Sequence, residues 1–319
     1  MKEVAVVTGG GGFIGSAVAR CLLSNGISVR IIDIMESNIN GVEKIKGSIL
    51  DQNVVSEAVR GCDAVIHLAA MLGVRKTEIE RLDCLNINIV GTVNILDACV
   101  KDGIKRIVFS SSSEIYGEPA ITPIKEESEK KPKSVYALTK LISEEYLAAY
   151  HKRYGLNYSI IRFFNVYGIG QVAEFVLPRF VKAVLEDNSP VVYGNGDQVR
   201  SFCYMDDAAT GVYLALIKDE ANGEVFNIGN NEEISITNLA RKVIEISGKD
   251  TKIQYVDMSE ADRSEGRDIL FRKPDISKAR KLIGYSPQVC LDEGIRKLVD
   301  HGNIPDSWYE PMNYTKHGY

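Results

Sequence analysis

The chain has 319 residues, of which 45% are hydrophobic and 25% charged, and it is long enough for one large α/β domain or two lobes. Its net charge of −5 comes without a basic run, so we expect neither nucleic acid nor a membrane surface as a partner. No uninterrupted apolar stretch reaches membrane-spanning length, and the first residues lead straight into a predicted strand, which leaves no room for a signal peptide.

Cysteine and histidine usage indicates a reduced compartment without a metal site. The six cysteines form no C-x-x-C pair and most lie in apolar surroundings, as expected for reduced thiols in a cytoplasmic protein. The four histidines are far apart, so we expect no bound metal. We interpret His67, which lies in an apolar run, as a partly buried histidine with satisfied hydrogen bonds.

The N-terminal stretch combines a strand, a glycine-rich turn and a helix. Residues 4–7 form a β-branched apolar run, as in a strand buried on both faces, and residues 13–23 read as an apolar helix. Between them Gly9, Gly12 and Gly15 follow a G-x-x-G-x-x-G spacing. Glycine permits a tight strand-to-helix turn and lets a pyrophosphate approach the N–H groups at the helix N-terminus.

An acidic residue completes this pattern. A second apolar strand, residues 29–32, ends in Asp33. This position is about 20 residues past the glycines, where a carboxylate accepts hydrogen bonds from an adenosine ribose. The same charge repels a 2′-phosphate, so we predict NAD rather than NADP. The alternative is a glycine-rich loop that binds no nucleotide.

Strand and helix patterns alternate through the rest of the first half. Strands are predicted at residues 42–45, 47–51, 63–70, 104–110 and 156–163, and helices at residues 54–60, 86–100 and 134–154. This alternation predicts an α/β fold, a doubly wound, Rossmann-like parallel sheet with helices on both faces. Leu68, Ala69 and Ala70 end one strand, and the two small alanines allow a cofactor to lie against its carboxyl edge.

The regular alternation of strand and helix patterns ends near Asn165. Further strands are predicted at residues 191–193 and 225–229, and helices at residues 235–247 and 291–301, with polar loops between them. We expect residues 1–165 to form an NAD-binding domain with the catalytic residues. Residues 166–319 would form a smaller, partly interleaved C-terminal lobe that binds the substrate. The aromatic tail 304–319 has no assigned role.

Tyr136 and Lys140 are the predicted chemical centre. They are four residues apart on a predicted helix, so their side chains share one face. A lysine ammonium beside a phenol favours the phenolate, so we expect the pKa of Tyr136 to be lowered toward neutral pH. Such a phenolate can take a proton from a hydroxyl while hydride leaves the same carbon. Ser112, at the end of the preceding strand, is placed to donate a hydrogen bond to the same oxygen.

Eight motifs in order then resemble the extended short-chain dehydrogenases that act on nucleotide sugars. They run from residue 4 to about residue 300 and read T-G-G-G-G-F-I-G, H-L-A-A, N-I-V-G-T, S-S-S-E-I-Y-G, Y-A-L-T-K, R-F-F-N-V-Y-G, G-N-G-D-Q-V-R-S-F-C-Y-M-D-D and R-K-P-D-I-S-K-A-R.

The resemblance implies bound NAD and a nucleoside-diphosphate sugar as substrate. The residues it assigns to NAD are Gly9, Gly12, Phe13, Ile14, Gly15, Asp33, Leu68, Ala69, Ala70, Tyr136 and Lys140. Family members carry an acid where this chain has Ser48, so adenine recognition is assigned to Asp51. Asn165 and Arg200 would hold the diphosphate, and Asp268 would lie near the nucleoside. Either Arg263 or Arg267 replaces an arginine of the family pattern, and we assign Arg267.

The resemblance also implies the reaction type, with Ser112, Tyr136 and Lys140 as the catalytic trio. The sugar C4 hydroxyl would be oxidised to a transient 4-keto sugar, and the hydride would then return. Glu114 resembles the base that removes the C5 proton in dehydratases and decarboxylases of the family. Ser113, however, is a poor acid for expelling the C6 hydroxyl as water, and no arginine-rich loop follows Gly117.

We therefore predict an NAD-dependent 4-epimerase, with a dehydratase or decarboxylase that uses Glu114 as the alternative. A non-catalytic NAD-binding regulator is the remote alternative, which the presence of the trio disfavours. As in relatives, we expect a homodimer formed through the helices that start near residues 86 and 134, whose apolar faces are rich.

Overall fold

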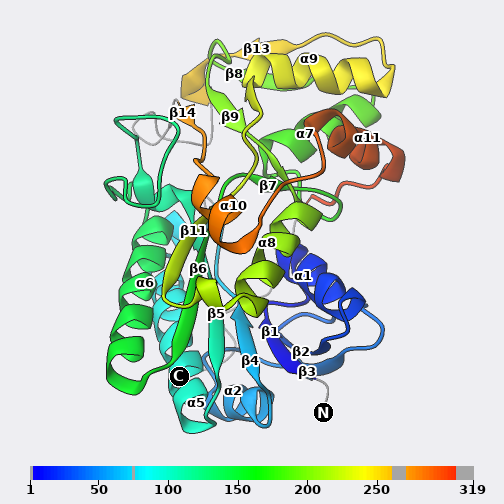
Figure 1. The fold of residues 1–319 in the computed structure, drawn as a ribbon. Coiled ribbons are helices and arrows are strands. Elements are labelled where there is room, and N and C mark those ends of the chain that lie inside the picture. The colour runs from blue at the N-terminus through cyan, green and yellow to red at the C-terminus, as the bar shows by residue number, and fades with distance from the viewer. Residues whose placement is uncertain (1–2, 74–75, 261–270, 307–319) are drawn as a thin grey trace.

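The computed structural model describes residues 3–73, 76–260 and 271–306. At its centre is a seven-stranded sheet in which every pair of neighbouring strands is parallel (Figure 1). In spatial order the strands are β11 (Glu224–Ile228), β6 (Asn157–Phe163), β5 (Arg106–Ser112), β4 (Ala64–His67), β1 (Val4–Thr8), β2 (Ser28–Asp33) and β3 (Glu43–Lys46). The predicted doubly wound parallel sheet is confirmed.

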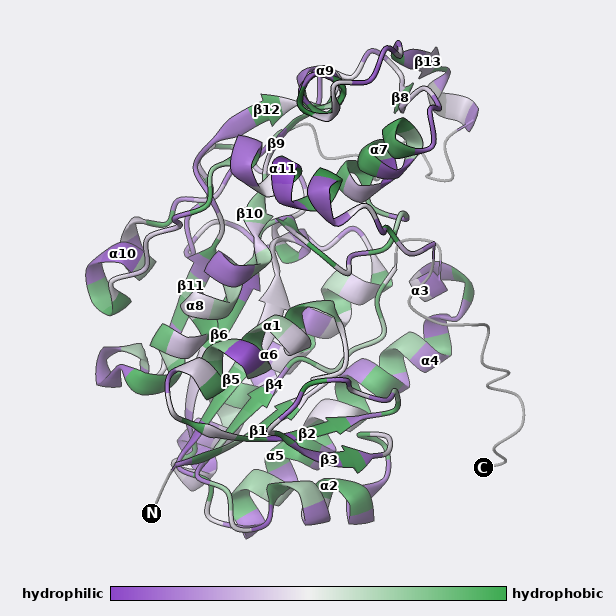
Figure 2. Cartoon of the chain, turned by 90° about the vertical axis from the view of Figure 1, so that its right-hand side faces the viewer, coloured by the Kyte–Doolittle hydropathy of each residue, from purple (hydrophilic) through white to green (hydrophobic). Residues whose placement is uncertain are grey.

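Helices cover both faces of this sheet because side chains alternate along each strand. Ala5 and Val7 of β1 belong to one buried hydrophobic cluster, whereas Val6 points into the other. The first cluster lies under α1 (Phe13–Ser24) and α8 (Met205–Ile217), and the second under α2 (Gln52–Val59), α5 (Gly91–Lys101) and α6 (Val135–Tyr154). In Figure 2 the hydrophobic colour follows the central strands between these layers.

The third strand, predicted over residues 42–45 and 47–51, is present but shorter, as β3. The strand ends at Lys46, and Asp51 is instead the N-cap of α2, where its carboxylate accepts hydrogen bonds from the N–H groups of Asn53 and Val54. A short acceptor side chain directly before an apolar helix begins that helix rather than extending a strand.

The predicted helix at residues 86–100 is part of a longer one. After α3 (Lys76–Ile79), the helix begins with α4 (Arg81–Leu85), passes through a π-helical turn η1 (Asn86–Val90) and continues as α5. The helix has 21 residues, and an 18-residue window within it has a mean hydropathy of 1.2, enough by length and composition to cross a membrane, but half of that window is buried in the protein. It is a core helix, packed against α2 and α6.

The second half of the chain contributes to the large sheet and also builds a smaller region beyond the carboxyl ends of the strands, at the top of Figure 1. Strand β11 pairs with β6, and α8 packs on α1.

The smaller region contains three short sheets, β10–β7, β12–β9–β14 and β13–β8. Its strands are β7 (Val166–Tyr167), β8 (Val191–Tyr193), β9 (Val199–Ser201), β10 (Cys203–Tyr204), β12 (Glu233–Ser235), β13 (Gln254–Val256) and β14 (Phe271–Arg272). Its helices are α7 (Val176–Leu185), α9 (Ile236–Ser247) and α11 (Leu291–His301), whereas α10 (Ser277–Ile283) packs against β11 and α8 at the large sheet. Single 3₁₀ turns η2 (Ser113–Tyr116), η3 (Asp219–Ala221) and η4 (Met258–Glu260) complete the fold.

Candidate active site

The glycine-rich turn joins β1 to α1 at the carboxyl edge of the sheet. Gly9 has a φ of 70°, and its carbonyl accepts a hydrogen bond from Gly12 at 3.1 Å. A Cβ on Gly15 would lie 2.0 Å from the Gly9 oxygen, so α1 packs directly on the turn. No side chain caps α1, and its first N–H groups are therefore available to an anion. Phe13 and Ile14, both predicted to contact NAD, begin this helix.

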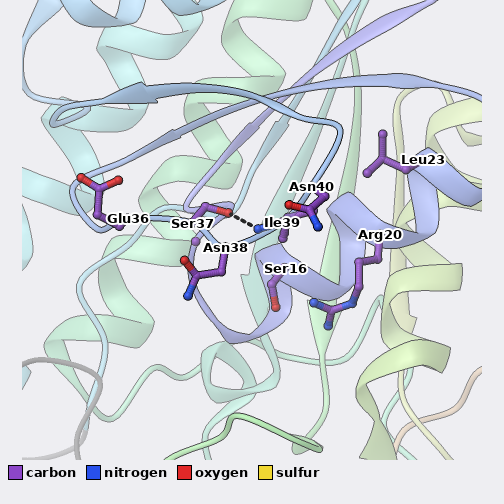
Figure 3. Close-up of a pocket in the computed structure, with 9 residues that line it drawn as sticks. Ser16, Arg20, Leu23, Glu36, Ser37, Asn38, Ile39 and Asn40 are labelled. Carbon is purple, nitrogen blue, oxygen red and sulfur yellow. Dashed lines mark hydrogen bonds between the residues drawn. The ribbon is translucent and has the colours of Figure 1, made fainter.

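Asp33 ends β2 and faces the turn. One carboxylate oxygen accepts a hydrogen bond from the Gly11 N–H at 2.9 Å, and the other from the Met35 N–H at 2.9 Å. Beside the turn lies a cavity of about 560 Å³ (Figure 3). Its lining comes from the turn and α1 and from the loop after β2: Gly11, Ser16, Arg20, Leu23, Glu36, Ser37, Asn38, Ile39 and Asn40. A turn made of glycines, a helix N-terminus without a side-chain cap and a carboxylate at the end of β2 beside the turn fit a dinucleotide such as NAD.

The end of β4 lies against the same turn. The Thr8 hydroxyl accepts hydrogen bonds from the N–H groups of Leu68, at 3.1 Å, and Ala69, at 3.0 Å. A Cβ on Gly9 would lie 2.8 Å from the Ala69 nitrogen. The structure thus brings most of the predicted NAD residues to one edge. Asp51, in contrast, caps α2, and its predicted contact with adenine stays a prediction.

The hydrogen bonds of His67 assign its tautomer. Because the Thr8 hydroxyl already accepts two N–H groups, it donates to His67 Nδ1, 2.7 Å away. Nε2 therefore carries the proton and donates to the Thr92 hydroxyl at 3.0 Å. Burial, and secondly the charge of Lys140, lower the pKa of His67 to about 3. The predicted satisfied histidine is confirmed, but the side chain is buried completely rather than partly.

Ser112, Glu114 and Tyr136 meet where β5 ends and α6 begins. Ser112 lies close enough to the Tyr136 phenol to lower its pKa, and the Ser112 hydroxyl accepts from the Glu114 N–H at 3.2 Å. Ser134 is the N-cap of α6: its hydroxyl accepts from the Ala137 N–H and donates to Glu114 Oε2 at 3.2 Å. This N-cap fixes Glu114 beside the start of the catalytic helix.

Lys140 lies one turn further along α6. Its Nζ is 5.7 Å from the centroid of the Tyr136 ring and 4.9 Å from that of Phe109, and it donates to the Ser110 hydroxyl at 3.4 Å. Burial lowers the pKa of Lys140 to about 7, while Cys84 and Glu144 act in the opposite direction. The structure therefore assembles the four predicted catalytic residues.

The expected lowering of the Tyr136 pKa is wrong for the protein alone. Burial raises this pKa, and the charge of Glu114 raises it further, against the hydrogen bond from Ser112. Sequence spacing indicated the lysine but not the low-dielectric surroundings or the neighbouring carboxylate.

The predicted substrate residues lie partly within the described structure. Asn165 follows β6 with a φ of 38°, an uncommon conformation for a residue other than glycine, and its amide donates to the Ser201 carbonyl at 2.9 Å. Arg200 precedes Ser201 on β9, so the two predicted diphosphate ligands are close together. Arg263, Arg267 and Asp268 lie outside the described residues.

One residue without a predicted role also shapes the site. Asn88, in the π-helical turn, accepts from the Met71 N–H at 2.7 Å and donates to the Met71 carbonyl and to the Thr139 hydroxyl, both at 3.0 Å. It therefore ties the loop after β4 to α6 next to Lys140. The signal that could have identified Asn88 from the sequence is a polar residue on the apolar face of a predicted helix. In the described part of the chain, no group of three or more His, Cys, Asp or Glu side chains is arranged to hold a metal.

Comparison with known proteins agrees with this geometry. Residues 5–229 match the NAD dependent epimerase/dehydratase family. The chain is 34% identical to a UDP-N-acetyl-alpha-D-glucosaminuronate decarboxylase from Bacillus cytotoxicus, over 94% of this chain and 97% of that protein. It is also 34% identical to a putative UDP-glucose 4-epimerase from Methanocaldococcus jannaschii, over 92% and 97%.

A solved structure gives the same picture in three dimensions. The UDP-glucose 4-epimerase of Thermus thermophilus, in complex with NAD, superposes with a TM-score of 0.85 at 30% identity. The match covers 94% of this chain and 99% of the other.

Proposed function

Because the chain belongs to the NAD-dependent epimerase/dehydratase family, we propose that it is a 4-epimerase of a nucleoside-diphosphate hexose and acts through a transient 4-keto sugar. The observation that carries this proposal is the meeting of Ser112, Tyr136 and Lys140 at the sheet edge that also carries the glycine-rich turn. A protein that only senses NAD does not need this trio, which disfavours a regulator.

Each side chain has a distinct task in this proposal. Tyr136 takes the proton from the sugar C4 hydroxyl and later returns it, and Ser112 hydrogen-bonds the same oxygens. Lys140 holds the nicotinamide ribose and stabilises the phenolate. NAD, when bound, accepts the hydride, and its positive nicotinamide opposes the effects of burial and Glu114 on the Tyr136 pKa. Asp33 orients the adenosine ribose, and Asn165 and Arg200 bind the diphosphate.

Similarity does not choose between the reactions of this family, since a decarboxylase and a putative 4-epimerase are equally identical to the chain. Residue chemistry favours epimerisation over dehydration, because Ser113 is buried and is a poor acid for expelling a hydroxyl. The second candidate rests on Glu114. Its carboxylate lies close enough to raise the pKa of Tyr136, a suitable place for a base that removes the C5 proton of a 4-keto sugar.

Reaction in heavy water separates the two candidates. The protein is incubated with NAD and a panel of UDP- and dTDP-hexoses and -hexuronates, and products are read by mass and NMR. Epimerisation predicts an isobaric product without deuterium at C5, because C5 keeps its hydrogen. Deuterium at C5, or loss of water or carbon dioxide, would replace the epimerase proposal by the Glu114-dependent one.

The Glu114→Gln variant sharpens this test. For an epimerase we expect only a modest loss of rate, because the side chain is not a proton acceptor in that reaction. For C5 chemistry the loss is about two to four orders of magnitude. Glu118→Gln, which removes an acid four residues further along, is the matched control and keeps the wild-type rate.

Assembly and location form part of the proposal. Large hydrophobic side chains lie exposed on two packed helical segments, Leu82 (69%) and Val90 (47%) on the 81–101 helix and Leu138 (42%) and Tyr146 (38%) on α6. Figure 2 shows α4 at one edge of the molecule. A second copy of the chain on these faces removes them from water, so the protein is a homodimer. Its six cysteines are free thiols, as expected for a protein of the reducing cytoplasm.

A further inference from the structure

A row of polar side chains crosses the large sheet where hydrophobic residues would be usual. Ser111 of β5 is in register with Arg162 of β6, which is in register with Asn227 of β11. Register partners on parallel strands point to the same face. All three side chains are buried, with 2%, 2% and 0% exposure.

Glu144 of α6 closes over this row. Its carboxylate accepts from Arg162 Nε at 2.9 Å and from Arg162 Nη2 at 2.7 Å, a two-point ion pair. The Ser111 hydroxyl donates to the same carboxylate at 2.6 Å. Only 6% of Glu144 is exposed, so this pair is shielded from water.

The third guanidinium nitrogen of Arg162 extends the network. Nη1 donates to the Tyr116 hydroxyl and to the Glu126 carbonyl, both at 2.7 Å. The Tyr116 hydroxyl in turn donates to Asn227 Oδ1 at 2.7 Å. Such a buried, connected network holds its members in one geometry.

The network lies directly beneath the catalytic helix. Glu144 follows Lys140 by four residues on α6, so the two side chains share one face, and both are buried. The titratable groups that act on Lys140 or are acted on by it are Cys84 from α4 and His67 from β4, together with Glu144. The ring of Tyr136, one turn earlier on α6, lies near Lys140 Nζ, and Glu114 of η2 acts on Tyr136.

From this arrangement we propose that Arg162 and Glu144 form a charge-balanced positioning pair for the catalytic end of α6. Glu144 fixes α6 on β5 through Ser111, and the guanidinium of Arg162, held in a two-point ion pair, offsets part of the negative charge with which Glu144 raises the pKa of Lys140. His67 and Cys84 are neutral near pH 7, so Glu144 is the charged acid that acts on Lys140, and Arg162 of β6 is its ion-pair partner. Neither residue touches substrate or NAD in this role. The inference rests on the proposed function only for its kinetic test.

The sign of the effect makes the proposal falsifiable. Glu144→Gln removes the acid that raises the pKa of Lys140 and leaves the Arg162 charge unbalanced, so the pKa of Lys140 falls. Arg162→Gln removes the cation that offsets Glu144, so the pKa of Lys140 rises. The pH profile of kcat/KM is therefore expected to shift by about one unit toward acid in the first variant and toward alkali in the second. Arg162→Lys, which keeps the charge, and the double variant Glu144→Gln/Arg162→Met, which removes both, are expected to stay at the wild-type position.

A measurement without turnover separates this inference from the reaction assignment. NMR titration of protein labelled with [ε-¹³C]lysine, with the Lys140 signal identified by its loss in Lys140→Met, follows the Lys140 pKa directly. The same opposite displacements are expected whichever nucleotide sugar is the substrate. Arg106→Gln is the control, because Arg106 lies at the other end of β5 and also pairs with an acid and backbone carbonyls. It is expected to lower stability without moving either titration.

Opposite shifts support the proposal, whereas unchanged titrations, or shifts of both variants in one direction, overturn it in favour of a purely structural pair. Each single variant leaves a buried charge unpaired and can fail to fold. Where Arg162→Gln fails, the double variant decides, since the acid shift of Glu144→Gln must disappear in it. Where Glu144→Gln fails, the alkaline shift of Arg162→Gln must disappear in the double variant. Persistence of either shift overturns the charge-balance argument.

Discussion

At the scale of single residues, the surroundings of Tyr136 define the task of the site. The phenol lies beside the Glu114 carboxylate and beside Lys140, whose pKa is lowered to about 7. The acidity of the phenol therefore does not follow from its residue type or from the four-residue spacing to the lysine alone. We expect Tyr136→Phe to lower kcat by about two to four orders of magnitude, because the proton acceptor is lost. The ring and its packing remain, so NAD affinity measured by calorimetry is expected to stay near wild type. Near-normal turnover would show that another group is the base.

His67 gives a residue-scale prediction about stability. Its pKa is lowered to about 3 in the folded protein from an ordinary value of 6.5, so the folded state stays neutral while the unfolded chain takes up a proton below pH 6.5. Stability is thus lost as the pH falls through this window, by about 1.4 kcal/mol per pH unit. Between pH 6.5 and about pH 5, we expect the wild type to lose about 2 kcal/mol more of its free energy of unfolding than His67→Gln. Urea unfolding at both pH values measures the difference. Equal losses would contradict the assignment of a neutral His67.

At the scale of elements, the contact between the glycine-rich turn and α1 determines where the helix begins. A methyl group at Gly15 meets the Gly9 carbonyl oxygen at 2.0 Å and the Gly10 Cα at 2.8 Å, and both are backbone atoms that cannot rotate away. The helix can keep its position on the turn only if this residue has no side chain.

We therefore expect Gly15→Ala to destabilise the protein by about 1–3 kcal/mol, as overpacking does, and to weaken NAD binding as the turn shifts. Gly12→Ala is the comparison, because its Cβ would lie 3.3 Å from the Gly9 oxygen and its φ of −78° suits any residue. That variant is expected to fold nearly as well as wild type but to bind NAD more weakly. Equal thermal stability of the two variants would contradict the steric argument.

At the scale of the whole molecule, the two halves of the chain share one sheet. Strand β11 completes the edge beside β6, and α8 packs on α1 across the face that carries the nucleotide turn. Asn165 lies between β6 and β7, and its amide donates to the carbonyl of Ser201, the neighbour of Arg200 on β9. Strand β6 also packs against α6, so the large sheet keeps the predicted diphosphate ligands in a fixed relation to the catalytic helix.

The exposed hydrophobic faces of the 81–101 helix and α6 predict that the protein forms a dimer through them. Light scattering at micromolar concentration is expected to give the mass of a dimer. The double variant Leu82→Glu/Leu138→Glu is expected to be monomeric, because it places charges in the proposed contact. Ile121→Glu changes a side chain that is 78% exposed and lies outside both helices, so it should remain dimeric. A monomeric wild type would remove this part of the proposal.

The local pattern of the sequence by itself determined most elements of the first half of the chain and their order. In the second half it missed α7, α8 and α10, where polar loops were predicted. The apolar runs of β1, β5 and β6 and the bounds of α11 follow from neighbours a few residues apart, as does the Ser134 cap of α6. The NAD turn could be predicted for the same reason, since Gly9, Gly12, Gly15 and the strand before them are contiguous. Tyr136 and Lys140 could be paired because a helix places residues four apart on one face.

Only the tertiary structure decided how these groups behave. The raised pKa of Tyr136 and the tautomer of His67 depend on burial and on partners distant in the chain. The Arg162–Glu144 pair joins a strand and a helix through strand register, which no local pattern contains. Short-range periodicity determines secondary structure, whereas charge and hydrogen-bond energies in a low-dielectric interior depend on every element packed around the group.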